Sequence, residues 1–260
     1  MLNRIGASLF KIILIHLFFC VFFISTSARA SYLREPASED NPNDGMIDIL
    51  YPAQATAPYI ERRQKYSIMF SVLSEPFMPT KYASPTDGAF YEELFGGKQM
   101  QMTSVELTWK YNLPIVSVGV GITYGKANVK SNYSSILSGL DITKTSICGT
   151  LFFDAIMKEP YVAAYGKMEY YNFDYLETAD GFDDVSGKTA PSTAITAGLL
   201  IQLNFLDPDP KITQIGVSED GMQNAYLDIF ATQYSPSTAE GDPNFSNEKT
   251  EVGAGIRIEF

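Results

Sequence analysis

The last nine residues, 252–260, are VGAGIRIEF, and their polarity alternates with a period of two as far as the final residue. The apolar set is Val252, Ala254, Ile256, Ile258 and Phe260. The residues between them are small or charged. Because successive side chains of a β-strand point to opposite faces, this pattern predicts a strand with one apolar face and one face that carries Arg257 and Glu259.

The same period of two recurs in seven earlier segments of the chain. These segments are 66–72, 103–111, 116–124, 146–154, 162–171, 195–205 and 225–232. Together with 251–260 they predict eight β-strands in an all-β domain. Tyrosine, phenylalanine and glycine are frequent, at 16, 17 and 19 residues, and the two aromatic residues favour β structure.

The connections between the predicted strands alternate in length. Two are short, Asn-Leu-Pro at 112–114 and Lys-Glu-Pro at 158–160. The opposite ends are joined by long polar loops near 76–100, 128–141, 175–190 and 235–248. Short turns at one end and long loops at the other are typical of an antiparallel up-and-down barrel that crosses an outer membrane.

Two alternatives to an eight-stranded transmembrane β-barrel remain open at this point. The connection 206–221 is long where a short turn is expected, so it could hold further strands, and a ten-stranded barrel is possible. A soluble β-barrel would have the same period of two, with the apolar face turned inward.

The first thirty residues have the features of a secretory signal peptide. Arg4 and Lys11 precede an apolar run of 13 residues at 12–24, and Ala28 and Ala30 have the spacing that a signal peptidase recognises. The apolar run is too short for a membrane-spanning helix. Residues 1–30 are therefore predicted to be removed during secretion.

The composition of the remaining chain excludes several classes of function. Without the first thirty residues, which hold three basic and no acidic residues, the chain has 16 basic and 30 acidic residues and a formal net charge of −14. This charge disfavours nucleic acid as a partner. The one histidine, His16, would be lost, which excludes histidine-dependent catalysis and histidine metal sites. Cys148 would be the single cysteine, so no intrachain disulfide is possible. No catalytic, metal-binding or cofactor-binding residue is predicted.

The mature chain is predicted to have two parts. Residues 31–64 are polar, acidic and rich in turn residues, and they are predicted to form a flexible N-terminal extension. Residues 65–260 are predicted to form the transmembrane β-barrel domain.

The ending GAGIRIEF and the layout of turns and loops together resemble the small outer-membrane barrels of the OmpA, OmpX and OmpW type. The resemblance covers about residues 65–260 and lies in pattern and topology. It implies a place in the outer membrane of a Gram-negative envelope, in contact with lipid and lipopolysaccharide. It also implies that Ile256, Ile258 and Phe260 form the signal recognised by the outer-membrane barrel assembly machinery.

If the apolar face of each strand meets lipid, the charged residues of the other face point into the lumen. This predicted lumen network consists of Glu106, Lys110, Asp154, Lys167, Glu169, Asp228 and Arg257, with Glu251 and Glu259 on the same faces. Eight strands enclose a space just wide enough for side chains, and unpaired charges there would be costly. We therefore expect the charges to pair and to plug the lumen. A proton or ion path is the alternative, although the interleaved signs of the charges disfavour it.

Two functions are compatible with these predictions. The first is a non-enzymatic outer-membrane barrel with a structural or interaction role, which acts through its loops or its N-terminal extension on a protein partner that the sequence does not identify. The second is a small passive, porin-like channel for ions or small apolar molecules. A membrane-embedded hydrolase or acyltransferase is disfavoured, because such enzymes use a histidine and the mature chain has none.

Overall fold

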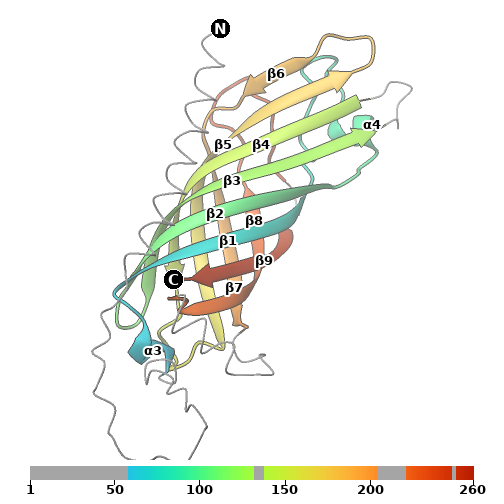
Figure 1. Cartoon of the computed structure of the whole chain (residues 1–260). Coiled ribbons are helices and arrows are strands. Elements are labelled where there is room, and N and C mark those ends of the chain that lie inside the picture. Colours follow the sequence, from blue (N-terminus) through green and yellow to red (C-terminus); the bar gives the residue numbers. More distant parts are fainter. Residues whose placement is uncertain (1–57, 132–137, 204–220, 248–249) are drawn as a thin grey trace, which may run out of the picture. The chain divides into compact units, whose positions relative to one another are not determined.

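The computed structural model describes residues 58–131, 138–203, 221–247 and 250–260. Within these ranges, eight β-strands form the wall of a barrel (Figure 1). They are β1 (Tyr66–Phe77), β2 (Met100–Asn112), β3 (Ser117–Ser131), β4 (Ser138–Phe152), β5 (Val162–Ala179), β7 (Ser192–Gln202), β8 (Asn224–Tyr234) and β9 (Glu251–Glu259). Each predicted segment overlaps one of these strands, so the predicted all-β fold is confirmed. The predicted signal peptide and residues 31–57 of the predicted extension lie outside the described residues.

The eight strands pair antiparallel in a closed ring. The ring closes between β1 and β9, where Met69–Ser74 pair with Ala254–Glu259. Next to this pairing, the amide of Ile68 donates to the carbonyl of Phe260 (3.0 Å) and the amide of Phe260 donates to the carbonyl of Ile68 (2.9 Å). Because β7 pairs directly with β8, and β5 pairs with both β4 and β7, the ring is complete with eight strands rather than ten. Residues 206–220 of the connection 206–221, which suggested ten strands, lie outside the described residues.

The two ends of the barrel differ. We call one the turn end, because it carries the tight turn at 113–116, where the amide of Leu113 donates to the carbonyl of Val116 (3.0 Å). Helix α3 (Tyr59–Arg62) precedes β1 at this end. We call the opposite end the loop end. It carries residues 78–99, which contain helix α4 (Tyr91–Phe95), and residues 235–247. In the part of the chain that the structure describes, no helix is both long and apolar enough to cross a membrane.

The outward face of the barrel is apolar from the turn end to beyond its middle. This apolar belt consists of side chains that are each 40–67% exposed: Val72, Val105, Trp109, Val120, Ile122, Ile147, Leu151, Met168, Ile195, Leu199, Ile229, Val252 and Ile256. The alternate residues of the same strands face inward and are mostly buried. A water-soluble barrel would have the opposite arrangement, whereas an apolar outer band with a polar interior is the arrangement of a barrel in lipid.

Beyond the apolar belt, towards the loop end, the polarity of the two faces reverses. On β3 the outward residues Lys126, Asn128 and Lys130 are exposed, while the inward residues Ala127 and Val129 are each 4% exposed. One row of register partners marks the border on β1 to β5: Ser74, Thr103, Lys126, Thr143 and Asp174. This part of the wall therefore has an apolar core and a polar surface, as expected where the barrel leaves lipid and meets water.

The strands at the loop end are longer than predicted. The predicted loop 128–141 is partly strand, since β3 ends at Ser131 and β4 begins at Ser138, and residues 132–137 lie outside the described residues. The predicted loop 175–190 contains a short strand, β6 (Val185–Lys188), which pairs with Asp174–Glu177 of β5 (Figure 1). β5 therefore pairs with β7 along its first half and with β6 near its end.

Candidate functional site

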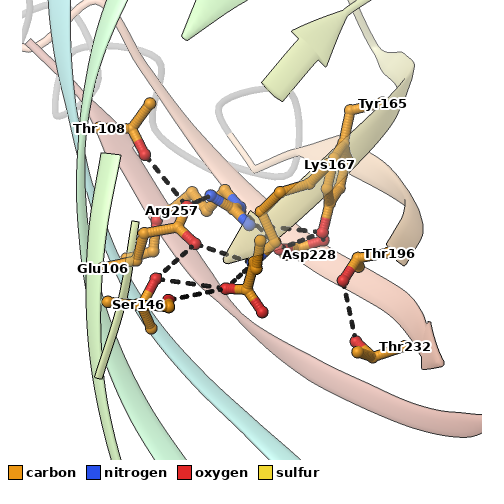
Figure 2. Close-up of polar contacts among 12 residues, drawn as sticks. Glu106, Thr108, Ser146, Tyr165, Lys167, Thr196, Asp228, Thr232 and Arg257 are labelled. Carbon is orange, nitrogen blue, oxygen red and sulfur yellow. Dashed lines mark hydrogen bonds and ion pairs between the residues drawn. The ribbon is translucent and has the colours of Figure 1, made fainter. Parts of the chain in front are cut away.

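The interior behind the apolar belt contains a group of ion pairs around Arg257 of β9, which we call the central network (Figure 2). The guanidinium of Arg257 contacts Glu106 of β2 (Nη1 to Oε1, 2.5 Å) and Asp228 of β8 (Nε to Oδ2, 2.6 Å). The Nζ of Lys167, on β5, lies 2.9 Å from Oε2 of Glu106 and 3.1 Å from Oε1 of Glu169. Positive and negative groups therefore alternate across the lumen from Asp228 to Glu169.

Lys144 of β4 extends the central network towards the loop end. Its Nζ lies 3.2 Å from Oε2 of Glu169 and 3.1 Å from the hydroxyl oxygen of Tyr234. The hydroxyl of Tyr234 in turn donates to Glu75. The sequence did not identify Lys144, because the predicted strand began after it. The signal was nevertheless present, since Lys144 is two residues before Ser146 and therefore lies on the same inward face.

Hydroxyl groups occupy the sides of the carboxylates that the cations leave open. The hydroxyl of Tyr165 lies 3.0 Å from each carboxylate oxygen of Asp228. The hydroxyl of Thr108 donates to Glu106 (3.1 Å), as Figure 2 shows. Buried charges with both ionic and hydrogen-bond partners recover much of their desolvation penalty, so this arrangement makes a charged interior tolerable.

A glycine on β3 makes the room that Thr108 needs. Gly121 faces the lumen, and a Cβ added there would lie 2.6 Å from Oγ1 of Thr108 and 2.9 Å from the carbonyl oxygen of Leu107. Any side chain at this position would therefore displace the hydroxyl that donates to Glu106. This close approach explains the need for glycine at an interior strand position.

A second group of charges, the turn-end cluster, lies between the central network and the turn end. The Nζ of Lys110 lies 2.5 Å from Oδ2 of Asp154 and 2.7 Å from Oε1 of Glu259. Tyr59 of α3 is fully buried next to these three side chains. Its hydroxyl donates to Glu259 (2.9 Å) and accepts from Lys110 (2.8 Å). Burial and the negative charge of Glu259 raise the pKa of Tyr59 well above its usual range, so its hydroxyl keeps its proton.

Helix α3 packs against the turn end of the barrel. The amide of Tyr59 donates to Oε2 of Glu159 (2.7 Å), and the guanidinium of Arg62 lies 3.5 Å from Oε1 of the same residue. The sequence predicted a flexible extension that includes residues 58–64. These residues are instead packed on the barrel, because Tyr59 enters the lumen and the helix binds a residue of the β4–β5 connection.

The loop end is closed by a cluster of buried rings, which we call the aromatic cap. It consists of Phe77, Tyr82, Tyr91, Phe95, Tyr171, Phe173, Tyr234 and Phe245. Phe245 stacks on Tyr82 with a centroid distance of 5.0 Å and meets Phe173 edge-on at 5.3 Å. The hydroxyl of Tyr82 donates to Glu177, and burial together with this carboxylate raises the pKa of Tyr82 above its usual range. Side chains of the loops at 78–99 and 235–247 therefore pack together with strand side chains at the loop end.

Little space remains between the central network and the aromatic cap. The cavity there has a volume of about 10 Å³, and its lining includes Glu75, Ser104, Lys144 and Lys167. Among the described residues, Oε2 of Glu75 and the hydroxyl of Ser104 have no hydrogen-bond partner. A cavity of roughly 10–15 Å³ is needed for one water molecule, so this space suits a single water molecule.

The structure places all seven residues of the predicted lumen network inside the barrel, in two groups. Glu106, Lys167, Glu169, Asp228 and Arg257 belong to the central network, and Lys110 and Asp154 belong to the turn-end cluster. The residues of the predicted assembly signal lie on the outward face of β9: Ile256 and Phe260 are exposed and Ile258 is half-buried. Sequence reasoning missed Lys144, Tyr59 and Tyr165.

The fold and the interior define a closed eight-stranded antiparallel barrel with an apolar outer belt and an ionised core. No protein-family model matches the chain, and no curated protein matches it. Among solved structures it is similar to Ail, the attachment invasion locus protein of Yersinia pestis, at 16% identity over 76% of this chain and 100% of that chain, with a TM-score of 0.40. It is also similar to Neisserial surface protein A, at 12% identity over 76% of this chain and 98% of that chain, with a TM-score of 0.39. The outer membrane protein OprG from Pseudomonas aeruginosa is similar at 11% identity over 75% of this chain and 95% of that chain, with a TM-score of 0.40.

Proposed function

We propose that the chain is a non-enzymatic β-barrel of the bacterial outer membrane with a structural or interaction role. The apolar belt supports this location, because a continuous apolar outer band is stable in lipid and is a liability in water. The closed ring supports it too, since no strand edge with unpaired backbone groups would face hydrocarbon. The predicted signal peptide and the predicted assembly signal at the end of β9 are consistent with the same destination.

The observation that supports the proposed role is the series of buried side chains along the interior of the barrel. From the turn end to the loop end, the lumen is occupied by Tyr59, the turn-end cluster, the central network and the aromatic cap. An ion that crossed the barrel would have to separate pairs such as Arg257 and Glu106, whose atoms are 2.5 Å apart. The interior is therefore best explained as a polar core that holds the wall rigid, which leaves the loops and the outer surface for interactions.

The ionisable groups of the interior also favour a role without catalysis. The carboxylates of Glu106, Glu169 and Asp228 are at most 1% exposed and are bound to lysine or arginine. General acid–base chemistry requires that a substrate reach the group that exchanges the proton. Buried carboxylates with fixed cationic partners do not meet that requirement.

Planar-bilayer recording of the purified chain that begins at Ser31 tests the plugged lumen. We expect no stable current steps after insertion, because paired side chains fill the lumen of an eight-stranded barrel. A porin of known conductance in the same membrane serves as the positive control, and heat-dependent gel mobility shows that the barrel has folded. Regular, voltage-stable steps would contradict the plug and favour a passive channel.

The location and orientation are tested in cells. The chain should fractionate with the outer membrane, and protease added to whole cells should cut the loop at 78–99 and spare the turn at 113–116. Recovery in the soluble periplasm would overturn the proposed location. Cleavage that occurs only after permeabilisation would invert the proposed orientation.

A further inference from the structure

The outward face of β3 changes from apolar to cationic at one step. Val118, Val120, Ile122 and Tyr124 face outward along the apolar belt, and the next outward residue is Lys126. Its register partners, Thr103 on β2 and Thr143 on β4, belong to the polar border row. Lys126 therefore stands directly beyond the apolar belt, at the level where a surrounding membrane would change from hydrocarbon to headgroups.

Two more lysines continue this cationic face. Lys130 lies on the same face of β3, four residues or about 13 Å of strand further from the apolar belt. The Nζ of Lys98, which precedes β2, donates to the carbonyl of Lys130 (3.1 Å), and this contact brings a third ammonium to the end of β3. We call Lys98, Lys126 and Lys130 the lysine strip. In the described part of the chain, none of the three forms an ion pair, and all three are exposed.

The charges elsewhere on the loop end are mostly negative. Exposed acids on the loops and outer strand ends include Asp87, Glu92, Glu93, Asp174, Asp180, Asp183, Asp184 and Glu240. Lys188, another exposed cation of this end, is paired with Asp174 (3.9 Å). One acid, Asp141, is exposed beside the lysine strip, opposite Asn128 on β4. Among the described residues, the lysine strip therefore gathers three exposed positive charges on the wall formed by β2 and β3.

We propose that the lysine strip binds the phosphate groups of lipopolysaccharide in the outer leaflet, a proposal that rests on the proposed outer-membrane location. Ammonium groups pair with phosphate as compact point charges. Cations just beyond a hydrocarbon belt lie at headgroup level, where anionic lipids attract them. Asn128, between Lys126 and Lys130, adds an amide donor for a phosphate oxygen.

The continuity of the lysine strip with the apolar belt selects a lipid over a soluble polyanion. Ile122 and Tyr124 lie immediately before Lys126 on the same face of the same strand. A ligand that occupies both surfaces must be apolar at one end and anionic at the other. Phosphorylated glycolipid has this chemistry, whereas a soluble anionic chain would contact the lysine strip alone.

The test is a binding titration of the full mature chain in detergent with purified lipopolysaccharide, followed by native mass spectrometry. Each lysine near a membrane surface contributes about fivefold in affinity, so Lys126→Gln combined with Lys130→Gln should weaken binding about 25-fold. Lys126→Arg combined with Lys130→Arg should retain binding, because the charge remains. The wild-type chain should bind dephosphorylated lipopolysaccharide as weakly as the double glutamine variant binds the native form.

The matched control is Lys65→Gln combined with Lys158→Gln, which removes the same charge from exposed positions at the turn end. This control should bind lipopolysaccharide as tightly as the wild type. Equal affinities for the wild type and the Lys126→Gln/Lys130→Gln variant would contradict lipopolysaccharide binding by the lysine strip. Equal affinities for native and dephosphorylated lipopolysaccharide would contradict it too. Fractionation of the same cells separates the two proposals: an outer-membrane chain with unchanged affinities refutes the strip alone, and a soluble chain refutes the location.

Discussion

Replacing Arg257 with methionine should destabilise the barrel strongly, because it leaves a buried carboxylate without a cation. The guanidinium is fully buried and contacts Glu106 at 2.5 Å and Asp228 at 2.6 Å. After its removal Glu106 keeps Lys167 at 2.9 Å, whereas among the described residues Asp228 keeps only the hydroxyl of Tyr165. Removal of one partner from a buried ion pair costs about 3–5 kcal/mol, so we expect the free energy of unfolding to fall by that amount.

Urea-induced unfolding of the barrel in lipid vesicles measures this change. Trp109 is the single tryptophan and lies on the outward face at 66% exposure, so its fluorescence should report the transfer from lipid to water. Lys188→Ala is the exposed control, because its pair with Asp174 spans 3.9 Å at the surface and should contribute less than about 1 kcal/mol. Adding Asp228→Leu to Arg257→Met should restore part of the loss, since the unpaired carboxylate is then absent.

An effect of Arg257→Met smaller than about 1 kcal/mol would refute the reasoning. It would mean that water enters the lumen and solvates Asp228 once the guanidinium is gone. In that case the interior would behave as a hydrated surface, and the plugged lumen would lose its main support.

Three further changes test other parts of the structure. Gly121→Val should lower stability by about 1–3 kcal/mol, because its Cβ would collide with Thr108, while Gly149→Ala, which meets no atom within 4 Å, should be tolerated in the same unfolding assay. Deleting Phe260 should sharply reduce the heat-modifiable folded form and Phe260→Tyr should preserve it; normal yields of the deletion variant would argue against an assembly signal. Tyr59→Phe should cost about 1–3 kcal/mol, since it removes a buried hydroxyl that both donates and accepts, and an unchanged unfolding midpoint would show that these two hydrogen bonds do not stabilise the barrel.

The sequence predicted the wall of the barrel well, because the period of two is a direct consequence of strand geometry. The alternation of side chains along each strand predicts that Glu106 and Arg257 face inward and that Trp109 faces outward, and the structure agrees. The prediction failed near the loop end, where the apolar residues face inward and the polar residues face outward. Ala127 and Val129 alternate with lysine and asparagine as strictly as the earlier residues of β3 do, but here the apolar residues face inward. The sequence instead predicts a loop from residue 128.

The pairing of the interior charges could be anticipated only in part. The alternation along a strand gives the direction of each side chain. The ion-pair partner of that side chain depends on how strands distant in sequence are staggered around the ring. Lys110 contacts Asp154 and Glu259, which lie on other elements of the chain. Tyr59 had no detectable signal, since α3 has four residues and follows a polar, acidic stretch without any period.

The position of Arg257 on the last strand has a consequence for how the barrel is made. Glu106 is 151 residues earlier in the chain, and Asp228 belongs to the neighbouring strand β8. Without β9, Asp228 has no counter-ion among the described residues, and the edges of β1 and β8 are open. The same nine-residue strand therefore supplies both the backbone pairing that closes the ring and the arginine that pairs with Asp228. An assembly intermediate without β9 would have two unpaired strand edges and would lack the Arg257–Asp228 ion pair, so closure of the ring and formation of this ion pair depend on the same strand.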